Sequence, residues 1–400
     1  MLLDVAIFAG VLITAIILLS PRLSRQPLWR AVITPLASII GSGFLILGPL
    51  LDDAYGYLAP VVMAALCLAA FAFGWAVRYN IANISDEADT RGHAENRLET
   101  ASSWALAFAY IISVAYYLNL FGAFGVSLTP FDDPFYARVL TTAAFALILV
   151  LGWGHGFKAL EHLEYYSVAA KLAIIVGLLI GMAVYFWHRA TGGSLVLIEP
   201  RLHGWGAVTL AFGLIVTVQG FETSRYLGEE YDPPTRIRSM RLAQGVSTVI
   251  YMIYVVLIAY VFQRSELKMS ETAIVDMMQV IAPILPALLV IAALTAQMSA
   301  AVADTGGTGG LFTELSGNRI NPRIGYLIIV LAGVTLTWVA NIFEIIAYAS
   351  RAFALYYGLQ AAIALTTTRR RKHPVLHSAG FLALAVLAAA IVLFGQPAEG

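Results

Sequence analysis

Long apolar stretches separated by short polar ones run through almost the whole chain of 400 residues. A hydrocarbon core of about 30 Å needs about 20 apolar residues in a helix. Measured against that length, the pattern predicts an all-α polytopic membrane protein with about twelve transmembrane helices. The predicted spans lie near residues 1–20, 31–51, 55–80, 101–126, 135–153, 163–187, 205–228, 242–262, 286–314, 324–341, 342–367 and 376–394.

Composition and charge agree with a chain embedded in a lipid bilayer. Hydrophobic residues make up 60% and charged residues 12%, against roughly 25% charged in soluble domains. The 24 Lys and Arg balance the 24 Asp and Glu, so no basic excess indicates nucleic acid. Most basic residues fall in alternate loops, which predicts that those loops are cytoplasmic and that both chain ends are outside.

Two predicted spans are interrupted by glycine at their centres. The second reads TPLASIIGSGFLILGPLL and the seventh TLAFGLIVTVQGFETSRYL, about 180 residues further along. Each opens a block of five spans, and transporters built from inverted repeats carry such breaks at matching positions. We therefore predict an extra N-terminal helix and loop over 1–28, repeats over 29–189 and 204–368, and a C-terminal helix and tail over 369–400.

An unwound turn at membrane depth leaves backbone groups without partners, which is tolerated beside a cavity or a ligand. Freed amides attract anions, and freed carbonyls attract cations or ammonium groups. Two crossing breaks therefore predict a site for a zwitterion or a cation. Close packing of helices through small residues is the alternative explanation of these glycines. The predicted substrate-binding residues at the breaks are Ile40, Gly41, Ser42, Gly43, Gln219, Gly220, Phe221 and Glu222.

Three motifs resemble the amino acid-polyamine-organocation (APC) superfamily, whose members have the LeuT-type fold of five plus five inverted helices. IGSGF at 40–44 resembles its first broken helix, and GFETSRYLGEEYDPPTRIRSMRLAQG at 220–245 resembles its sixth helix and following loop. GFKALEHLEYYSVAAKLAIIVGLLIGM at 156–182 is similar to its fifth helix. Two features depart from the family: MSAAVADTGGTGGLFTEL stands where an arginine-containing pattern is usual, and an extra helix precedes the core.

Charged residues within spans are candidates for function because charge at membrane depth is costly. The resemblance implies that Lys171 replaces a coupling sodium ion and bridges the fifth helix to the first and eighth. Asp304 needs a partner, and Lys171 and Arg351 are the basic residues within spans that offer one. A fixed ion pair is the structural alternative. We predict Lys171, Asp304 and Ser299 as coupling residues.

Two further side chains complete the predicted substrate site. Arg351 shares a helix face with Glu344 and offers either a gate salt bridge or a fork for a substrate carboxylate. Tyr117 is one of several tyrosines able to line a central cavity. Glu222 is equally suited to binding a positive group and to capping the following half-helix.

These features together predict a secondary active transporter of a small amino acid or related amine. It is expected to work by alternating access and to be coupled to protons. A symporter in the bacterial cytoplasmic (inner) membrane is the expected setting. The alternatives are a transporter of an inorganic cation such as potassium and a sensor that moves nothing. Catalysis is not expected, because the chain has no P-loop, HExxH or nucleophile elbow. No cofactor or metal is predicted.

Overall fold

The computed structural model describes residues 2–41, 43–83, 92–154, 158–228, 230–263, 270–372 and 374–398, with the side chains of 158–164 excepted. Within these ranges the chain forms fifteen α-helices, three short 3₁₀ helices and no strand. The predicted class is confirmed: the protein is an all-α polytopic membrane protein.

The helices follow one another in a simple order along the chain. They are α1 (Leu2–Leu19), α2 (Pro21–Ser24), α3 (Pro27–Ile39), α4 (Gly43–Tyr55), η1 (Gly56–Leu58), α5 (Ala59–Asn83), α6 (His93–Val126), α7 (Pro134–Gly154), α8 (Lys158–Thr191), α9 (Gly204–Gly213), η3 (Ile215–Val218), η4 (Phe221–Tyr226), α10 (Pro233–Ile258), α11 (Ala273–Ile281), α12 (Leu285–Leu315), α13 (Pro322–Val339), α14 (Ile342–Arg370) and α15 (Val375–Phe394).

Nine helical stretches in the described part of the chain are long and apolar enough to cross a membrane. They include α1, α6, α7, α8, α10, α12, α13 and α15, and one stretch that joins α4 to α5. The remaining predicted spans correspond to α14 and to the two interrupted helices. An interruption shortens each piece, since α3 has 13 residues and α9 has 10.

Local sequence explains where several helices begin. Proline stands in the first turn of α3, α10 and α13, where its missing N–H costs nothing and its fixed φ suits a helix. Asp232 and Asn321 cap the last two of these helices, because their side chains accept from the backbone N–H of Thr235 and Arg323. The starts of α3, α10 and α13 are therefore set by proline and capping residues and not by the spacing of apolar residues.

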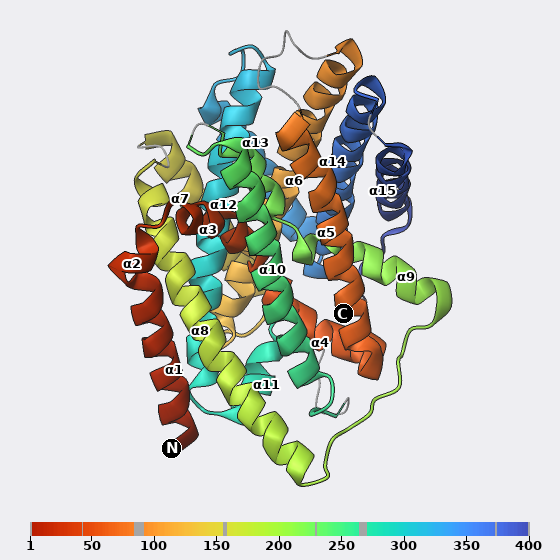
Figure 1. Cartoon of the computed structure of the whole chain (residues 1–400). Helices are drawn as coiled ribbons and strands as arrows, with labels where there is room; N and C mark the ends of the chain where they lie inside the picture. Colours follow the sequence, from red (N-terminus) through yellow and green to blue (C-terminus); the bar gives the residue numbers. More distant parts are fainter. Residues whose placement is uncertain are drawn as a thin grey trace.

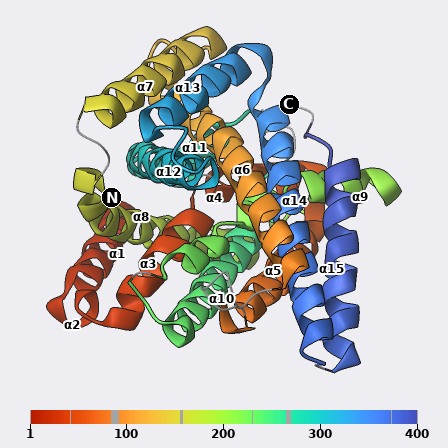
Figure 2. The same ribbon diagram turned by 90° about the horizontal axis from the view of Figure 1, so that it is seen from above.

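Helix α6 lies at the centre of the bundle and packs against α12, α14, α7 and α13 (Figures 1 and 2). Helix α10 packs against α3 and α5. The two outer helices lie on opposite edges: α1 contacts α8, and α15 contacts α14 (Figure 2). This arrangement brings the interrupted parts of both helices into the interior, because α3 packs on α10 and η4, and η3 packs on α14 and α4.

Two helices lie outside the predicted spans. The short α2 follows α1, and α11 packs its apolar face on α12 and α4 between two membrane helices. Helix α6 also begins at His93, eight residues before the predicted span at 101. Hydropathy marks the apolar part of a helix and not its polar extension into water, which explains this difference.

Candidate functional site

The first break lies between α3, which ends at Ile39, and α4, which begins at Gly43. A helix that stops leaves its last carbonyls without helical partners. Two of these carbonyls accept hydrogen bonds from other helices. Lys171 Nζ in α8 donates to Ala37 O at 2.8 Å, and Tyr251 OH in α10 lies 2.9 Å from Ile39 O. Side chains from two neighbouring helices therefore hold the first break.

The predicted residues of this break lie in the protein interior. Ile40, Gly41 and Gly43 are buried, and Ser42 falls outside the described residues. Gly43 is pressed against the other interrupted helix, because a Cβ atom there would lie 2.7 Å from Thr217 Cα. Glycine at 43 thus allows two backbones to approach closely.

The second break is longer than the first. Helix α9 ends at Gly213, η3 follows, and Gly220 has φ 116°, a left-handed conformation that favours glycine. Ser350 in α14 pairs with the broken backbone twice: its hydroxyl donates to Gly213 O at 2.6 Å and accepts from Val216 N at 3.1 Å. Gln219, next to Gly220, is buried. The second predicted interruption is therefore present as an unwound segment.

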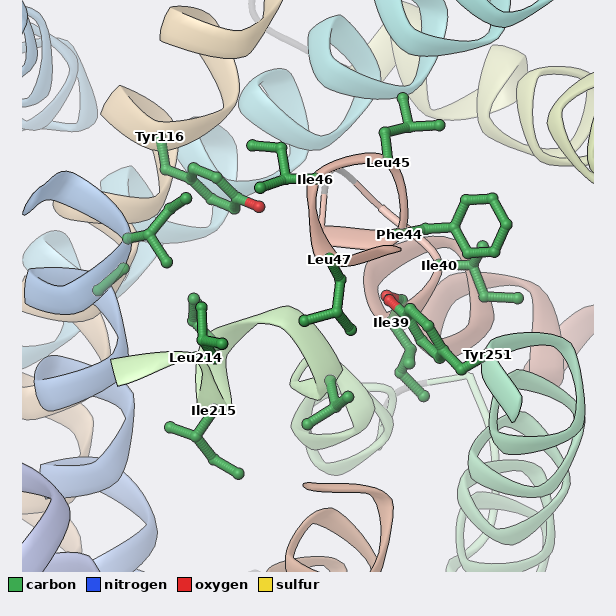
Figure 3. Close-up of a cluster of buried hydrophobic side chains, with 14 of the residues drawn as sticks. Ile39, Ile40, Phe44, Leu45, Ile46, Leu47, Tyr116, Leu214, Ile215 and Tyr251 are labelled. Carbon is green, nitrogen blue, oxygen red and sulfur yellow. The ribbon is translucent and has the colours of Figure 1, made fainter. Parts of the chain in front are cut away.

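The two breaks are in contact with each other. A Cβ atom on Gly220 would lie 2.5 Å from Ser38 Cβ, so this backbone lies directly on the end of α3. Tyr251 reaches the crossing from α10 (Figure 3), and its hydroxyl lies 2.9 Å from Ile39 O and 2.7 Å from Thr217 O. One O–H is shared between a carbonyl of each broken helix, so Tyr251 ties the two breaks together.

The space beside the crossing is small in this conformation. A hollow of about 10 Å³ is lined by Ile39, Val218 and Tyr251, together with residues of α5 and α10. Such a volume suits about one water molecule. Apolar side chains fill the surroundings, including Leu47, Leu214 and Ile215 (Figure 3). A solute larger than water therefore requires the helices around the breaks to move apart.

Glu222 forms hydrogen bonds both within the second break and to α14. Its Oε2 accepts from Gly220 N at 3.0 Å and from Tyr357 OH at 2.7 Å, and the residue is only 1% exposed. The neighbouring Phe221 stacks on the Tyr357 ring, with centroids 5.0 Å apart and planes 15° apart. The carboxylate therefore both caps a backbone N–H and joins η4 to α14.

Asp304 lies on α12 and faces α6. Its Oδ2 accepts a hydrogen bond from the Ser113 hydroxyl, and the Glu222 carboxyl group is near enough to act on it electrostatically. Tyr117, one turn beyond Ser113 on α6, is electrostatically coupled to Asp304, and a hydrogen bond joins its side chain to that of Gln219. The breaks and α12 thus share one polar cluster. Because like charges repel, two buried carboxylates favour a positively charged neighbour.

A further buried polar residue of α12, Gln297, has no predicted role in the sequence. Gln297 is 0% exposed, and within the described part of the chain neither Nε2 nor Oε1 of its amide has a hydrogen-bond partner. It precedes Asp304 by seven residues, which places both on one face of α12. Gln219 Oε1 is likewise without a partner there. Buried polar atoms are almost always paired, so the Gln297 amide and the Oε1 atom of Gln219 are suited to receiving a ligand.

A scan of family models matches residues 21–395 to a family described as an APC superfamily transporter. The chain belongs to the APC superfamily. An uncharacterized protein of Aquifex aeolicus (strain VF5) is 40% identical over 404 residues, which cover 99% of this chain and 98% of that protein. The similarity therefore extends over the entire bundle, including both breaks and the outer helices.

For this APC superfamily transporter, Arg351 is placed differently from the other predicted site residues. Its Nε donates to Gly395 O at 2.9 Å, at the contact with α15. It also lines an apolar groove of about 810 Å³ with Phe108 and Leu355, which are on outward faces of their helices. The described contacts of Arg351 do not join it to the polar cluster, so its role as a carboxylate clamp stays a prediction.

The predicted coupling residues also differ in their surroundings. Lys171 contacts the first broken helix directly, as the resemblance implied, and α8 packs against α12. Asp304 has Ser113 as its described hydrogen-bond partner, and Ser299 is half-buried on the same helix. No described contact places Ser299 with either of them. The three coupling roles stay predictions.

Several residues of the site were not predicted from sequence: Tyr251, Ser350 and Ser113. Each is a hydroxyl within an apolar span, and each pairs with a freed backbone group or a buried carboxylate. Sequence offers only a weak signal for them, because hydroxyls inside spans usually bond to their own helix. Hydroxyls on helices expected to pack on a break would include Tyr251 and Ser350, whereas Ser113 is marked only by its contact with the buried Asp304.

A separate acidic hollow of about 310 Å³ lies where α6 ends and α7 and α11 begin. It is lined by the carboxylates Asp132, Asp133, Glu271 and Asp276. Burial raises the pKa of Asp132, and repulsion from Asp276 and Asp133 adds to this. Within the described residues no group of three or more His, Cys, Asp or Glu is arranged to hold a metal ion.

Proposed function

We propose that this protein is a secondary active transporter of a small amino acid or related amine, driven by protons across a bacterial cytoplasmic membrane. Its solute would bind where the two broken helices cross, and the two repeats 29–189 and 204–368 would move relative to each other to expose the site to either side. The single observation that carries this proposal is the hydrogen bond from Lys171 Nζ to Ala37 O at the first break.

The Lys171 contact favours protons over a bound metal ion as the coupling species. Freed carbonyls at a half-helix end are the groups that coordinate a coupling cation in broken-helix transporters. Here a protein ammonium group occupies Ala37 O, and Tyr251 is shared between Ile39 O and Thr217 O. A lysine can gain and lose a proton, whereas carbonyls cannot, so Lys171 supports proton coupling.

The two buried carboxylates support a substrate with a positive group. Asp304 and Glu222 are both at least nine-tenths buried, and their charges interact. An ammonium group near them reduces that repulsion. The same feature suits an inorganic cation such as potassium, which is the second candidate. It is less well supported, because Lys171 and Tyr251 occupy carbonyls that such an ion needs as ligands.

A ligand screen on purified protein tests the proposal. The probes are the twenty common amino acids, a set of aliphatic amines, and potassium against sodium chloride. A ligand at 100 times its dissociation constant adds about 2.7 kcal/mol to apparent stability. We expect a thermal shift with at least one amino acid or amine and none that distinguishes potassium from sodium. A shift with potassium alone would favour the inorganic cation.

Uptake into proteoliposomes then tests coupling for each compound that shifts the melting curve. We expect accumulation only with an imposed pH gradient, and we expect Glu222→Gln and Asp304→Asn to reduce it. Asp232→Asn is a matched control, because that carboxylate is exposed and caps α10 outside the polar cluster. Accumulation that is independent of the pH gradient in the unmodified protein would contradict proton coupling.

A further inference from the structure

Arg351 of α14 has no acidic partner in the described part of the chain. Its Nε and Nη2 both donate to a single acceptor, the Gly395 carbonyl that follows α15. Glu344, which shares its helix face, accepts from Asn341 N at 2.8 Å instead. Charged side chains in a membrane are usually paired, so this guanidinium group is suited to binding an anion from outside the chain.

A groove of about 810 Å³ opens beside this guanidinium group. It lies where α13 and α14 pack on α6 and where α15 packs on α14 (Figure 2). Apart from Arg351, Thr335 and Tyr348, its described lining is apolar. Leu331 and Phe108 in this lining are 61% and 54% exposed. The groove is within the roughly 300–1,000 Å³ of small-molecule sites, and its walls suit a hydrocarbon chain.

The position of α15 places the guanidinium group at one edge of the bilayer. Helix α15 has 20 residues and no Asp, Glu, Lys or Arg, which is the length that crosses a hydrocarbon core of about 30 Å. Its last residue, Phe394, has its ring centroid 5.4 Å from that of Trp205, and Trp205 is 59% exposed. Tryptophan is enriched at the membrane–water boundary. Arg351, which bonds to the next residue, Gly395, therefore lies at the level of the lipid headgroups.

From that level the groove extends toward the hydrocarbon core. Leu355 lines it one turn beyond Arg351, in the direction of the opposite edge of the bilayer. A phospholipid has its parts in the same order, with a phosphate at the boundary and acyl chains beneath it. The guanidinium fork matches phosphate geometry. The described lining contains no Asp or Glu that could hold the ammonium group of a zwitterionic headgroup, so a lipid with net negative charge fits best.

We propose that this groove is a binding site for one anionic phospholipid. Its phosphate is bound by Arg351, and one acyl chain lies against Leu355, Leu331 and Phe108. The lipid thereby joins α14 to the end of α15, and Arg351 serves a lipid phosphate in place of a solute carboxylate. Because both chain ends are predicted to be outside, the lipid belongs to the outer leaflet. The site requires a membrane around the chain but not the proposed transport activity.

Lipid titrations followed by native mass spectrometry test this site on the purified, delipidated full chain. The probes are dioleoyl phosphatidylglycerol, which is anionic, dioleoyl phosphatidylcholine, which is zwitterionic with the same acyl chains, and oleate. We expect the parent protein to bind the first phosphatidylglycerol molecule at least about tenfold more tightly than phosphatidylcholine. The measurement requires no solute.

Three variants separate the parts of the site. We expect Arg351→Gln to weaken phosphatidylglycerol binding at least about tenfold, to the level of phosphatidylcholine. Arg351→Lys keeps a cation but loses the fork, so we expect an intermediate affinity. Leu355→Trp narrows the groove and leaves the Arg351 side chain in place. We expect it to weaken phosphatidylglycerol binding at least about fivefold, because less of the acyl chain is buried.

Arg138→Gln is the matched control. It makes the same change in net charge, and Arg138 lies in α7 on the side predicted to be outside but does not line the groove. We expect its affinity for phosphatidylglycerol to stay within about twofold of the parent. Equal losses in Arg138→Gln and Arg351→Gln would overturn the site, because they indicate attraction by net charge alone.

Equal affinities of the parent protein for phosphatidylglycerol and phosphatidylcholine would also overturn the site. Oleate that binds more tightly than phosphatidylglycerol, and depends on Arg351 in the same way, would assign the groove to a free fatty carboxylate and reject the phospholipid. Should Arg351→Gln not fold, Arg351→Lys and Leu355→Trp carry the test. Parent-like phosphatidylglycerol affinity in both of these variants would reject the proposal.

Discussion

The two breaks look alike in sequence, yet they are held in opposite ways. At the first, freed carbonyls of α3 meet a cation, because Lys171 of α8 donates to Ala37 O. At the second, a freed amide meets a carboxylate, because Gly220 N donates to Glu222 of the same segment. Each break thus pairs its own backbone dipole with a charge of opposite sign, as helix ends require.

The source of each charge also differs. The first break is held by a neighbouring long helix, and α4 resumes as a regular α-helix within four residues. The second is followed by η4, whose charged residues pair with α14 and α6. Since local opening is easiest where regular hydrogen bonding is weakest, the second break is the one expected to move and the first the one expected to act as a fixed support.

The largest effect on stability and uptake is expected from a substitution at Gly220, where the two breaks touch. Gly220→Ala must place a Cβ atom 2.5 Å from Ser38 Cβ at φ 116°. Strain and overpacking together predict a loss of about 3 kcal/mol in folding stability and no measurable uptake. Thermal unfolding of the purified variant checks the first part. Gly245→Ala is the control, because a Cβ on that glycine of α10 would meet nothing within 4 Å. Equal melting temperatures for the two variants would mean that the breaks do not touch.

The next largest effect is expected from a substitution at Lys171, which tests whether its ammonium group stabilises the first break. Lys171→Met keeps the length of the side chain and leaves Ala37 O without its ammonium donor. Loss of a hydrogen bond from a charged group is worth about 1.5–3 kcal/mol. We expect pH-driven uptake to fall at least about tenfold while ligand-induced thermal shifts remain. The exposed Lys372→Gln serves as the control. Undiminished proton-driven uptake in Lys171→Met would remove Lys171 from coupling.

Sequence predicted the membrane class, the extent of most helices and the location of both interruptions. Hydropathy length decides the first two, and glycine inside an apolar run indicates the third. The unequal lengths of the breaks were not predictable, because Gly41 and Gly220 are each a local signal. The second unwinding extends back to Gly213 through contacts with Ser350, which lies 137 residues further along the chain.

The polar cluster was only partly predictable for a similar reason. Glu222, Lys171 and Asp304 are identifiable as charges within spans, and each lies in the interior. Arg351 is also a charged residue within a predicted span, yet it contacts the end of α15. A residue within a span can face either the centre of the bundle or a neighbouring helix. Sequence gives the depth of a residue but not the direction in which its side chain points.

A smaller effect on stability is expected from a substitution at Tyr251, which tests whether its hydroxyl joins the two breaks. Tyr251→Phe removes the one hydroxyl shared by Ile39 O and Thr217 O. A buried acceptor left without a partner costs about 1–3 kcal/mol, so we expect a clear fall in melting temperature with the fold retained. The control is Tyr260→Phe, whose hydroxyl bonds to Tyr57 O at an exposed position and should change stability by less than about 0.5 kcal/mol. If the two variants melt alike, the two breaks are not joined by Tyr251.

The substitution with the smallest expected effect, Gln297→Leu, tests whether the proposed solute site extends from the broken helices to the unbroken α12. Gln297 has neither amide atom paired within the described residues, whereas the equally buried Gln244 accepts from Arg78 and donates to Ala70 O. Replacing an unpaired buried amide by an apolar group of similar size is neutral or stabilising, and replacing a paired one is costly. We therefore expect Gln297→Leu to melt at or slightly above the parent temperature and Gln244→Leu below it. Uptake should be impaired in Gln297→Leu despite its intact stability, because the amide is retained for the solute. Destabilisation equal to that of Gln244→Leu would make Gln297 a structural residue and confine the site to the two breaks.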